Sequence, residues 1–344
     1  MGIYSMCPRT RKPGELSRHR VSSPPNRKEG KNMERKYRLH RLSFLMGVIF
    51  ACMLFIQIAQ AAPLAEYVSY MTEDKVLLNA LLWMPPGGTK TVVIYVPGMT
   101  GGFIGVHEIN PAAEGLTGKG YALLAVNMRT AGLHGMLFAR FEDYVKDIDA
   151  AIRFAKSRGF TEVVLWGVSL GGPRIMYYWS QTKDPSVRAL VFMGCIKSPY
   201  LEAQLRWNES ERARYDTFLQ GARDRVTQGK GNEVLTYTDW FPKVNVTLSA
   251  QTFVNIFGTL AESNASTVKF GSQITIPTLI IHGLKDEIAL PPNGQAIYDS
   301  LTAAPRREIV WVEDAGHYLI KGPVADKYGE TLTTWVPKFV PPTR

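Results

Sequence analysis

Short apolar runs separated by segments of helical periodicity make up most of residues 62–344. Six runs have the length and the apolar, often β-branched content of strands buried on both faces: 91–96, 121–127, 162–166, 187–193, 275–281 and 308–312. Two further runs within 66–84 flank a short turn and predict an antiparallel hairpin at a sheet edge. Helices are expected over 141–155, 294–303 and 323–336. This order predicts an α/β fold with a mostly parallel central sheet flanked by helices.

The alternation of strands and helices breaks over residues 197–270. This stretch has charged helical segments over 201–225 and a series of aromatic residues: Trp207, Tyr215, Phe218, Tyr237, Trp240, Phe241, Phe253 and Phe257. We interpret it as a helical cap inserted above the C-terminal edge of the sheet, and its aromatic content favours a substrate with an apolar or aromatic part. The alternative is a surface subdomain whose aromatic residues form their own core.

The formal net charge of +10 is concentrated in the first 61 residues. That segment has 12 lysine and arginine residues and 3 acidic ones, whereas residues 62–344 have 28 basic and 27 acidic residues. No basic stripe with interleaved aromatic residues occurs in the nearly neutral part. The charge therefore does not indicate binding to nucleic acid.

The N-terminal segment has the layout of a secretory signal peptide preceded by a polar extension. Residues 1–32 are rich in Pro, Ser, Arg and Lys and are expected to be disordered. A basic segment beginning at Met33 precedes a 13-residue apolar run, 44–56, and the Ala59-Gln60-Ala61 motif predicts cleavage after its last residue. Because signal peptides begin at the initiator, we expect translation to start at Met33.

Cleavage would leave a domain of residues 62–344 that is periplasmic or secreted and has no stable membrane span. An uncleaved anchor helix is the alternative, but the apolar run is shorter than the ~20 residues that a span needs. Cys195 would be the only cysteine of the mature chain, so no disulfide within that chain is expected.

The sequence Gly167-Val168-Ser169-Leu170-Gly171 directly follows one of the predicted strands. Its Gly-x-Ser-x-Gly spacing is that of a nucleophile elbow, a tight strand-to-helix turn that exposes the serine hydroxyl above the sheet. The flanking glycines are needed because the turn leaves no room for a Cβ atom. The Leu170 N–H points toward the space where a substrate oxyanion would form. A second Gly-rich turn over 97–102 makes the Met99 N–H the other candidate oxyanion donor.

Asp286 and His317 complete a candidate catalytic triad with Ser169. Each of the three follows the C-terminal end of a predicted strand, the edge at which open parallel sheets bind ligands. A serine hydroxyl needs a nearby base, and the imidazole in turn needs a carboxylate to fix its tautomer. Glu287 and Asp314 are alternative acids, although Asp314 is too close to His317 in sequence to orient its ring easily.

These motifs resemble those of the α/β-hydrolase superfamily over about residues 64–340. The resemblance lies in the oxyanion loop, the elbow, the acid loop and the histidine: 97–101, 167–172, 282–286 and 315–317. It implies that Ser169 is the nucleophile, Asp286 the acid and His317 the base, with Met99 and Leu170 as main-chain oxyanion donors. Pro97 stands where many members have histidine, so the subfamily stays open.

Together, the motifs and the resemblance predict an exported serine hydrolase that cleaves small-molecule carboxylic esters through an acyl-enzyme. No cofactor is expected, and no metal, because metal-binding motifs of the His-Glu-x-x-His or Cys-x-x-Cys kind do not occur. A thioesterase, amidase or acyltransferase remains an alternative, since a triad does not specify the leaving group. A non-catalytic binding protein with the same fold is a further alternative.

Overall fold

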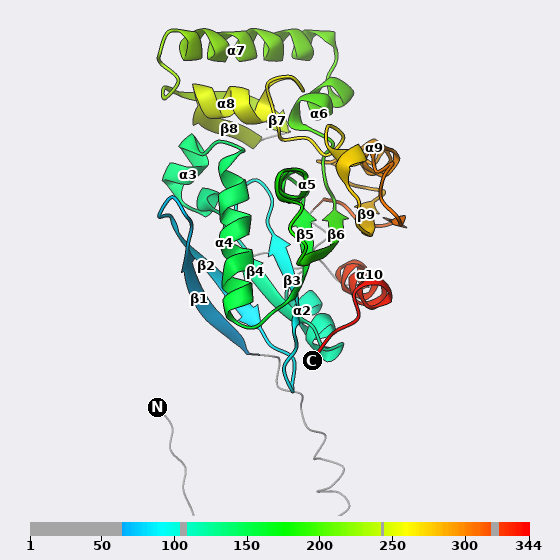
Figure 1. The fold of residues 1–344 in the computed structure, drawn as a ribbon. Coiled ribbons are helices and arrows are strands. Elements are labelled where there is room, and N and C mark those ends of the chain that lie inside the picture. Colours follow the sequence, from blue (N-terminus) through cyan, green and yellow to red (C-terminus); the bar gives the residue numbers. More distant parts are fainter. Residues whose placement is uncertain (1–63, 104–108, 242–243, 318–322) are drawn as a thin grey trace, which may run out of the picture. The chain divides into compact units, whose positions relative to one another are not determined.

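An eight-stranded, mostly parallel sheet forms the centre of the structure, a computed structural model that describes residues 64–103, 109–241, 244–317 and 323–344 (Figure 1). The strands in chain order are β1 (Ala65–Met71), β2 (Leu77–Trp83), β3 (Thr91–Val96), β4 (Ala122–Val126), β5 (Glu162–Val168), β6 (Val187–Met193), β9 (Thr278–Gly283) and β10 (Arg307–Val312). Their spatial order is β1-β2-β4-β3-β5-β6-β9-β10. β1, β2 and β4 pair antiparallel, and the other neighbours are parallel. The predicted fold class is confirmed.

Helices cover both faces of this sheet. α4 (Asp143–Ser157), α5 (Gly171–Thr182) and α9 (Pro292–Ser300) pack on one face, and α2 (Ile109–Gly118) and α10 (Pro323–Phe339) pack on the other. The side chains of β3 alternate between the two resulting cores, so that all six of its residues are buried. Burial on both faces explains why the central strands are continuous apolar runs.

Most predicted elements are found within a few residues of their expected positions. The bounds of β9 differ from the prediction at both ends. This strand begins at Thr278 rather than at 275, because Pro277 has no N–H to donate to a neighbouring strand. It also extends to Gly283, so His282 lies inside the strand and its side chain is buried. The strand therefore ends two residues later than the predicted residue 281.

Residues 197–270 form helices and a small sheet between β6 and β9. The elements are α6 (Pro199–Arg206), α7 (Glu209–Thr227), β7 (Val234–Phe241), β8 (Val244–Ser249) and α8 (Ala250–Phe257). They lie at the end of the molecule toward which β3, β5 and β6 point (Figure 1). The β7–β8 hairpin was not predicted. We call this segment the cap; the predictions for residues 1–61 lie outside the described residues.

The aromatic side chains of the cap pack against one another. Trp207, Tyr215, Tyr237, Trp240 and Phe253 are each less than a tenth exposed. The ring centroids of Trp207 and Tyr215 are 5.2 Å apart, and those of Trp207 and Trp240 are 5.1 Å apart. Contacts among these rings account for the aromatic content of the cap without reference to a substrate. The rings belong to the same buried cluster as the core between the sheet and α4 and α5. The side chain of Phe241 lies outside the described residues.

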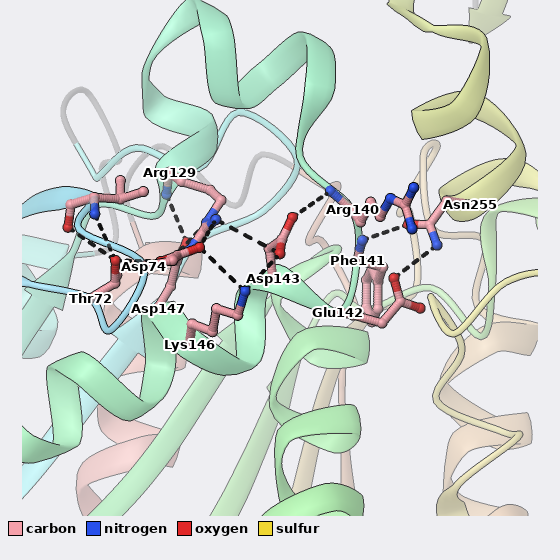
Figure 2. A network of polar contacts seen from close by, with 11 residues as sticks. Thr72, Asp74, Arg129, Arg140, Phe141, Glu142, Asp143, Lys146, Asp147 and Asn255 are labelled. Atoms are coloured by element: carbon pink, nitrogen blue, oxygen red, sulfur yellow. Dashed lines mark hydrogen bonds and ion pairs between the residues drawn. The ribbon is translucent and has the colours of Figure 1, made fainter. Parts of the chain in front are cut away.

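The cap is joined to the rest of the domain by two adjacent connections and by several polar contacts. Where the chain enters and leaves the cap, the Thr267 amide donates to the Lys197 carbonyl at 2.9 Å. At the start of α4, the Glu142 carboxylate accepts from the amide groups of Asn255 at 2.9 Å and Asn264 at 2.7 Å. Figure 2 shows Glu142 and Asn255 at one end of a network of polar contacts that extends to Arg129 and Asp74. A single carboxylate thus binds two parts of the cap.

The other end of the network fixes the loop after β4 (Figure 2). Arg129, in the short helix η1 (Arg129–Ala131), binds Asp147 through its backbone N–H at 2.9 Å and through Nε at 2.8 Å. Its two terminal nitrogens donate to Asp74 in the β1–β2 turn at 2.9 and 3.0 Å. Asp147 is buried, so its charge depends on Arg129 for compensation.

Asp74→Asn is expected to make the stability of the protein less sensitive to acid. The hydrogen bonds from Arg129 hold the pKa of Asp74 well below its ordinary value of 3.8. A lowered pKa in the folded state stabilises the protein above the ordinary value, and this stabilisation is lost as the pH falls below it. Urea unfolding should show a loss of about 1 kcal/mol at pH 7 in the variant, shrinking toward pH 3.

Asp149→Asn is the control for this experiment, because Asp149 forms an exposed pair with Arg153 one helical turn away. It should change the free energy of unfolding by less than about 0.5 kcal/mol. An equal pH dependence in wild type and Asp74→Asn would contradict the prediction.

In the part of the chain that the structure describes, no helix is long and apolar enough to cross a membrane.

Candidate active site

Ser169 lies on a tight turn between β5 and α5. Its φ of +54° is left-handed, which is rare for a residue with a side chain. The turn is held by hydrogen bonds from the Ser169 amide to the Met193 carbonyl at 3.0 Å, and from the Gly172 amide to the Ser169 carbonyl at 3.1 Å. A conformation of this kind is unfavourable on its own and persists only where the surrounding structure imposes it.

The two glycines of the Gly-x-Ser-x-Gly motif are required by close backbone contacts. A Cβ atom at Gly167 would lie 2.5 Å from the Gly171 carbonyl oxygen. A Cβ atom at Gly171 would collide with the Val96 carbonyl oxygen at the end of β3. Because these obstacles are backbone atoms, they cannot move aside as a flexible side chain would. The helix α5 can therefore approach the sheet closely only with glycine at both positions.

The structure brings Ser169, His317 and Asp286 together in one hydrogen-bonded chain. The Ser169 Oγ atom is 3.1 Å from His317 Nε2, and His317 Nδ1 is 3.0 Å from both carboxylate oxygens of Asp286. The Asp286 side chain is fully buried and the His317 side chain is 9% exposed. The three residues are 117 and 31 positions apart in the sequence, and they meet because the carboxyl ends of β5, β9 and β10 lie at the same edge of the sheet.

The hydrogen bonds of Asp286 assign the proton positions on His317. A carboxylate can only accept hydrogen bonds, so the Nδ1 atom of His317 carries the proton. The Nε2 atom is then free to accept from the Ser169 hydroxyl. Asp286 Oδ1 also accepts from the backbone amides of Ile288 at 2.9 Å and Ala289 at 2.7 Å. These two bonds fix the rotation of the buried carboxylate.

The alternative acids have other partners. Glu287 accepts from the backbone N–H of His317 at 3.2 Å, so it supports the loop rather than the imidazole. Asp314 binds Lys285 at 2.8 Å, and its side chain is 72% exposed.

The Nε2 atom of His282 is 2.7 Å from the Ala289 carbonyl, and burial lowers the pKa of this histidine. His282 is therefore a neutral donor that packs beneath the acid loop.

The Gly-rich loop after β3 lies directly against Ser169. A Cβ atom at Gly98 would be 3.1 Å from the Cβ atom of Ser169, so a larger residue would press on the serine. Leu170 is the N-cap residue of α5, where backbone N–H groups carry the positive end of the helix dipole. Among the described residues, neither the Met99 nor the Leu170 amide donates to a protein acceptor. Both candidate oxyanion donors are thus available to a ligand.

Two residues at this site were not identified from the sequence. Gly194 has a φ of +54°, and a Cβ atom there would lie 3.4 Å from Asp286 Oδ2. Arg174 on α5 is buried and donates to carbonyl groups of the Gly98 loop. The sequence signal for Arg174 was a charged residue on an otherwise apolar helix face, among Gly172, Ile175 and Met176.

A cavity of about 560 Å³ lies beside the loop after β4, and Arg129, His134 and Asp143 are among its lining residues. None of the three triad residues lines it. His134 is exposed and lies 5.1 Å from the Phe138 ring, measured between ring centroids. His107 lies outside the described residues. The described part of the chain has no cluster of three or more histidine, cysteine or carboxylate side chains arranged to hold a metal ion.

A mostly parallel sheet, with a serine on the turn after a central strand and with aspartate and histidine after later strands, defines the α/β-hydrolase class. The chain belongs to the hydrolase family described as "Serine aminopeptidase, S33", which matches residues 87–323.

One curated relative and two solved structures are similar to this chain over most of its length. An uncharacterized 31.7 kDa protein from the traX-finO intergenic region of Escherichia coli is 24% identical over 283 residues, covering 75% of this chain and 94% of that protein. The structure of Est1E from Butyrivibrio proteoclasticus with bound ferulic acid superposes with a TM-score of 0.60 at 18% identity, covering 79% of this chain and 99% of that one. The esterase domain of a Rhodothermus marinus protein superposes with a TM-score of 0.57 at 18% identity, covering 80% and 99%. At these identities the likeness of the structures shows a shared fold.

Proposed function

We propose that the protein is a serine hydrolase that cleaves carboxylic esters through an acyl-enzyme. The observation that carries this proposal is the continuous chain of contacts from Ser169 Oγ through both ring nitrogens of His317 to Asp286. A serine alone is a weak nucleophile near neutral pH, and the histidine supplies the base that it lacks. No cofactor takes part in the proposed reaction.

In the first half-reaction, Ser169 Oγ bonds to the acyl carbon of the ester while its proton passes to His317 Nε2. The negative charge that develops on the carbonyl oxygen accepts hydrogen bonds from the Met99 and Leu170 amides. Asp286 stabilises the imidazolium that forms. The tetrahedral intermediate then collapses, the bond to the alcohol oxygen breaks, and His317 returns the proton to the leaving alcohol.

In the second half-reaction, water takes the place of the alcohol. His317 Nε2 accepts a proton from the water as its oxygen bonds to the acyl carbon. A second tetrahedral intermediate collapses, the carboxylic acid leaves, and the proton returns to Ser169 Oγ. The enzyme ends in the state in which it began.

The proposed substrate is a small ester with an apolar or aromatic part. Support comes from the similarity to proteins named as esterases, and from the ferulic acid, an aromatic acid, bound to Est1E. The aromatic core of the cap gives no such support, because its rings contact one another. The family description names an aminopeptidase, so an amide is the competing substrate class.

We also propose that the protein is exported as a precursor and cleaved after Ala61. The support is the sequence of a basic segment, an apolar run and an Ala-x-Ala motif before the catalytic domain. N-terminal sequencing of the protein from cell fractions should find Ala62 first, in the periplasm or the medium. Retention of the preceding residues on a membrane-bound protein would support the anchor helix instead.

The decisive experiment labels purified residues 62–344 with a fluorophosphonate and maps the adduct by peptide mass spectrometry. One adduct per chain on Ser169, absent after heat denaturation, is expected. Hydrolysis should then be measured on matched p-nitrophenyl esters, thioesters and aminoacyl p-nitroanilides. No adduct on the folded protein, or an adduct elsewhere, would contradict the proposal. Faster cleavage of the anilides than of the esters would assign the site to amides.

A further inference from the structure

A buried arginine holds the loop that carries one of the proposed oxyanion donors. Arg174 lies on α5, five residues after Ser169, and is 1% exposed. Its Nη1 atom donates to the Pro97 carbonyl at 2.9 Å and to the Gly98 carbonyl at 2.7 Å. Its Nη2 atom is 3.5 Å from the Met99 carbonyl oxygen. One guanidinium therefore contacts three successive carbonyl groups of this loop.

The charge of Arg174 is not used in an ion pair among the described residues. A buried guanidinium is usually paired with a carboxylate, because taking the charge out of water is costly. Arg174 instead lies over the ring of Tyr144, with 4.2 Å between its Cζ atom and the ring centroid. The nearby Asp147 carboxylate is bound by Arg129. The charge of Arg174 is thus directed at the loop carbonyl groups.

The contact with Gly98 determines where the Met99 N–H points. The Gly98 carbonyl and the Met99 N–H belong to one planar, trans peptide group, so they point in opposite directions. With its oxygen held by Arg174, this peptide presents its N–H away from the arginine. Gly98 lies beside the serine, since a Cβ atom on it would be 3.1 Å from the Ser169 Cβ atom and 3.5 Å from its Oγ atom. A hydrogen bond from a cation to the carbonyl also polarises the peptide, which strengthens its N–H as a donor.

We propose that Arg174 is a positioning residue that orients and polarises the Gly98–Met99 peptide for stabilising the tetrahedral oxyanion. This proposal rests on the proposed function, since it assigns Arg174 a role in that reaction. The loop is also held from its other side, because the Met128 amide donates to the Gly101 carbonyl at 2.7 Å. Removal of Arg174 therefore releases the carbonyl groups of Pro97 to Met99 rather than the whole loop.

The test compares Arg174→Met, Arg174→Lys and Arg223→Met in the same purified domain, residues 62–344. We expect Arg174→Met to lower kcat for a p-nitrophenyl ester by ~10- to 100-fold, with KM changed by less than about threefold. Lysine keeps the charge but lacks the second terminal nitrogen, which in Arg174 faces the Met99 carbonyl, so Arg174→Lys should fall between wild type and Arg174→Met. Affinity for a trifluoromethyl ketone, which forms a tetrahedral adduct with serine, should fall in parallel with kcat.

Arg223→Met is the matched control, because Arg223 binds Glu262 within the cap at 2.6 and 2.8 Å. It should leave kcat within twofold of wild type. Circular dichroism and thermal melts establish that each variant is folded; if Arg174→Met is not, Arg174→Lys decides alone, with an expected loss of at least about fivefold. The pH profile of kcat/KM should be unchanged, since the triad is intact.

Several results would overturn the role of Arg174. These are an unchanged kcat in the folded Arg174 variants, a rise in KM alone, or an equal loss in Arg223→Met. Failure of the proposed function has a different signature, since the wild-type protein itself would then show neither fluorophosphonate labelling nor ester hydrolysis.

Discussion

Replacing Ser169 by alanine is expected to lower kcat for ester hydrolysis by about 10⁵- to 10⁶-fold. The variant lacks the Oγ atom that lies 3.1 Å from His317 Nε2. Without it no acyl-enzyme can form, and the remaining rate comes from water attacking an ester bound near the oxyanion donors. The measurement is single-turnover kinetics with a p-nitrophenyl ester, together with the intact mass after incubation with fluorophosphonate.

The matched control for this variant is Ser180→Ala on the same helix. The Ser180 hydroxyl donates to the Tyr177 carbonyl at 2.7 Å within α5, away from the triad. Its loss should leave kcat within twofold of wild type. If Ser169→Ala keeps more than about one percent of the wild-type rate while remaining folded, the nucleophile is a different group. The left-handed φ of Ser169 should persist in alanine, so the substitution tests chemistry rather than folding.

Asp286→Asn is expected to lower kcat by about 10⁴-fold with little change in structure. The carboxylate oxygen Oδ1 accepts from two backbone amides, at 2.9 and 2.7 Å, and an asparagine carbonyl oxygen would keep these bonds. Its NH₂ group would then occupy the place of Oδ2, 3.0 Å from His317 Nδ1. An NH₂ group can only donate, so it favours the tautomer protonated on Nε2, which cannot accept a proton from Ser169. The neutral amide also no longer stabilises the imidazolium, although its oxygen would stay 3.0 Å from Nδ1.

Asp314→Asn and Glu287→Gln serve as controls for this loss. The exposed Asp314 binds Lys285, so its replacement should leave kcat unchanged. Glu287→Gln keeps an oxygen that can accept from the His317 amide, and it should cost less than about tenfold in kcat. Steady-state kinetics on the three variants distinguish the acids. A larger loss in Glu287→Gln than in Asp286→Asn would assign the acid to Glu287.

The sequence was informative about the sheet and the triad because both depend on local patterns. All of β3 and residues 163–167 of β5 are buried, so these positions have apolar or small residues. Ser169, Asp286 and His317 follow strand ends, and the parallel arrangement of β5, β9 and β10 brings those ends to one edge. The positions of the strands in the sequence were therefore enough to predict that these three distant residues lie close together.

The cap was harder to predict, because its elements pack on one another rather than on the sheet. The β7–β8 hairpin contains a period-two signal, since the buried Val246 and Leu248 alternate with the exposed Asn245 and Thr247. The hairpin was not recognised because charged helical segments precede it in the sequence. The role of Arg174 could not be found from sequence, because it depends on the distance from α5 to the Gly98 loop. Contacts between side chains and backbone leave no periodic pattern.

The attachment of the cap has a mechanical consequence. A rigid body joined through two neighbouring chain crossings, such as those paired by Thr267 and Lys197, could swivel about the line through them. The hydrogen bond from Asn255 on α8 to Glu142 opposes this rotation. Glu142 also accepts a hydrogen bond from Asn264, so it holds both α8 and the segment that follows it. Swinging the cap outward would break both bonds to the Glu142 carboxylate, together with the bonds that Glu202 and Arg206 of the cap make to Asn293 and to the Ile288 carbonyl.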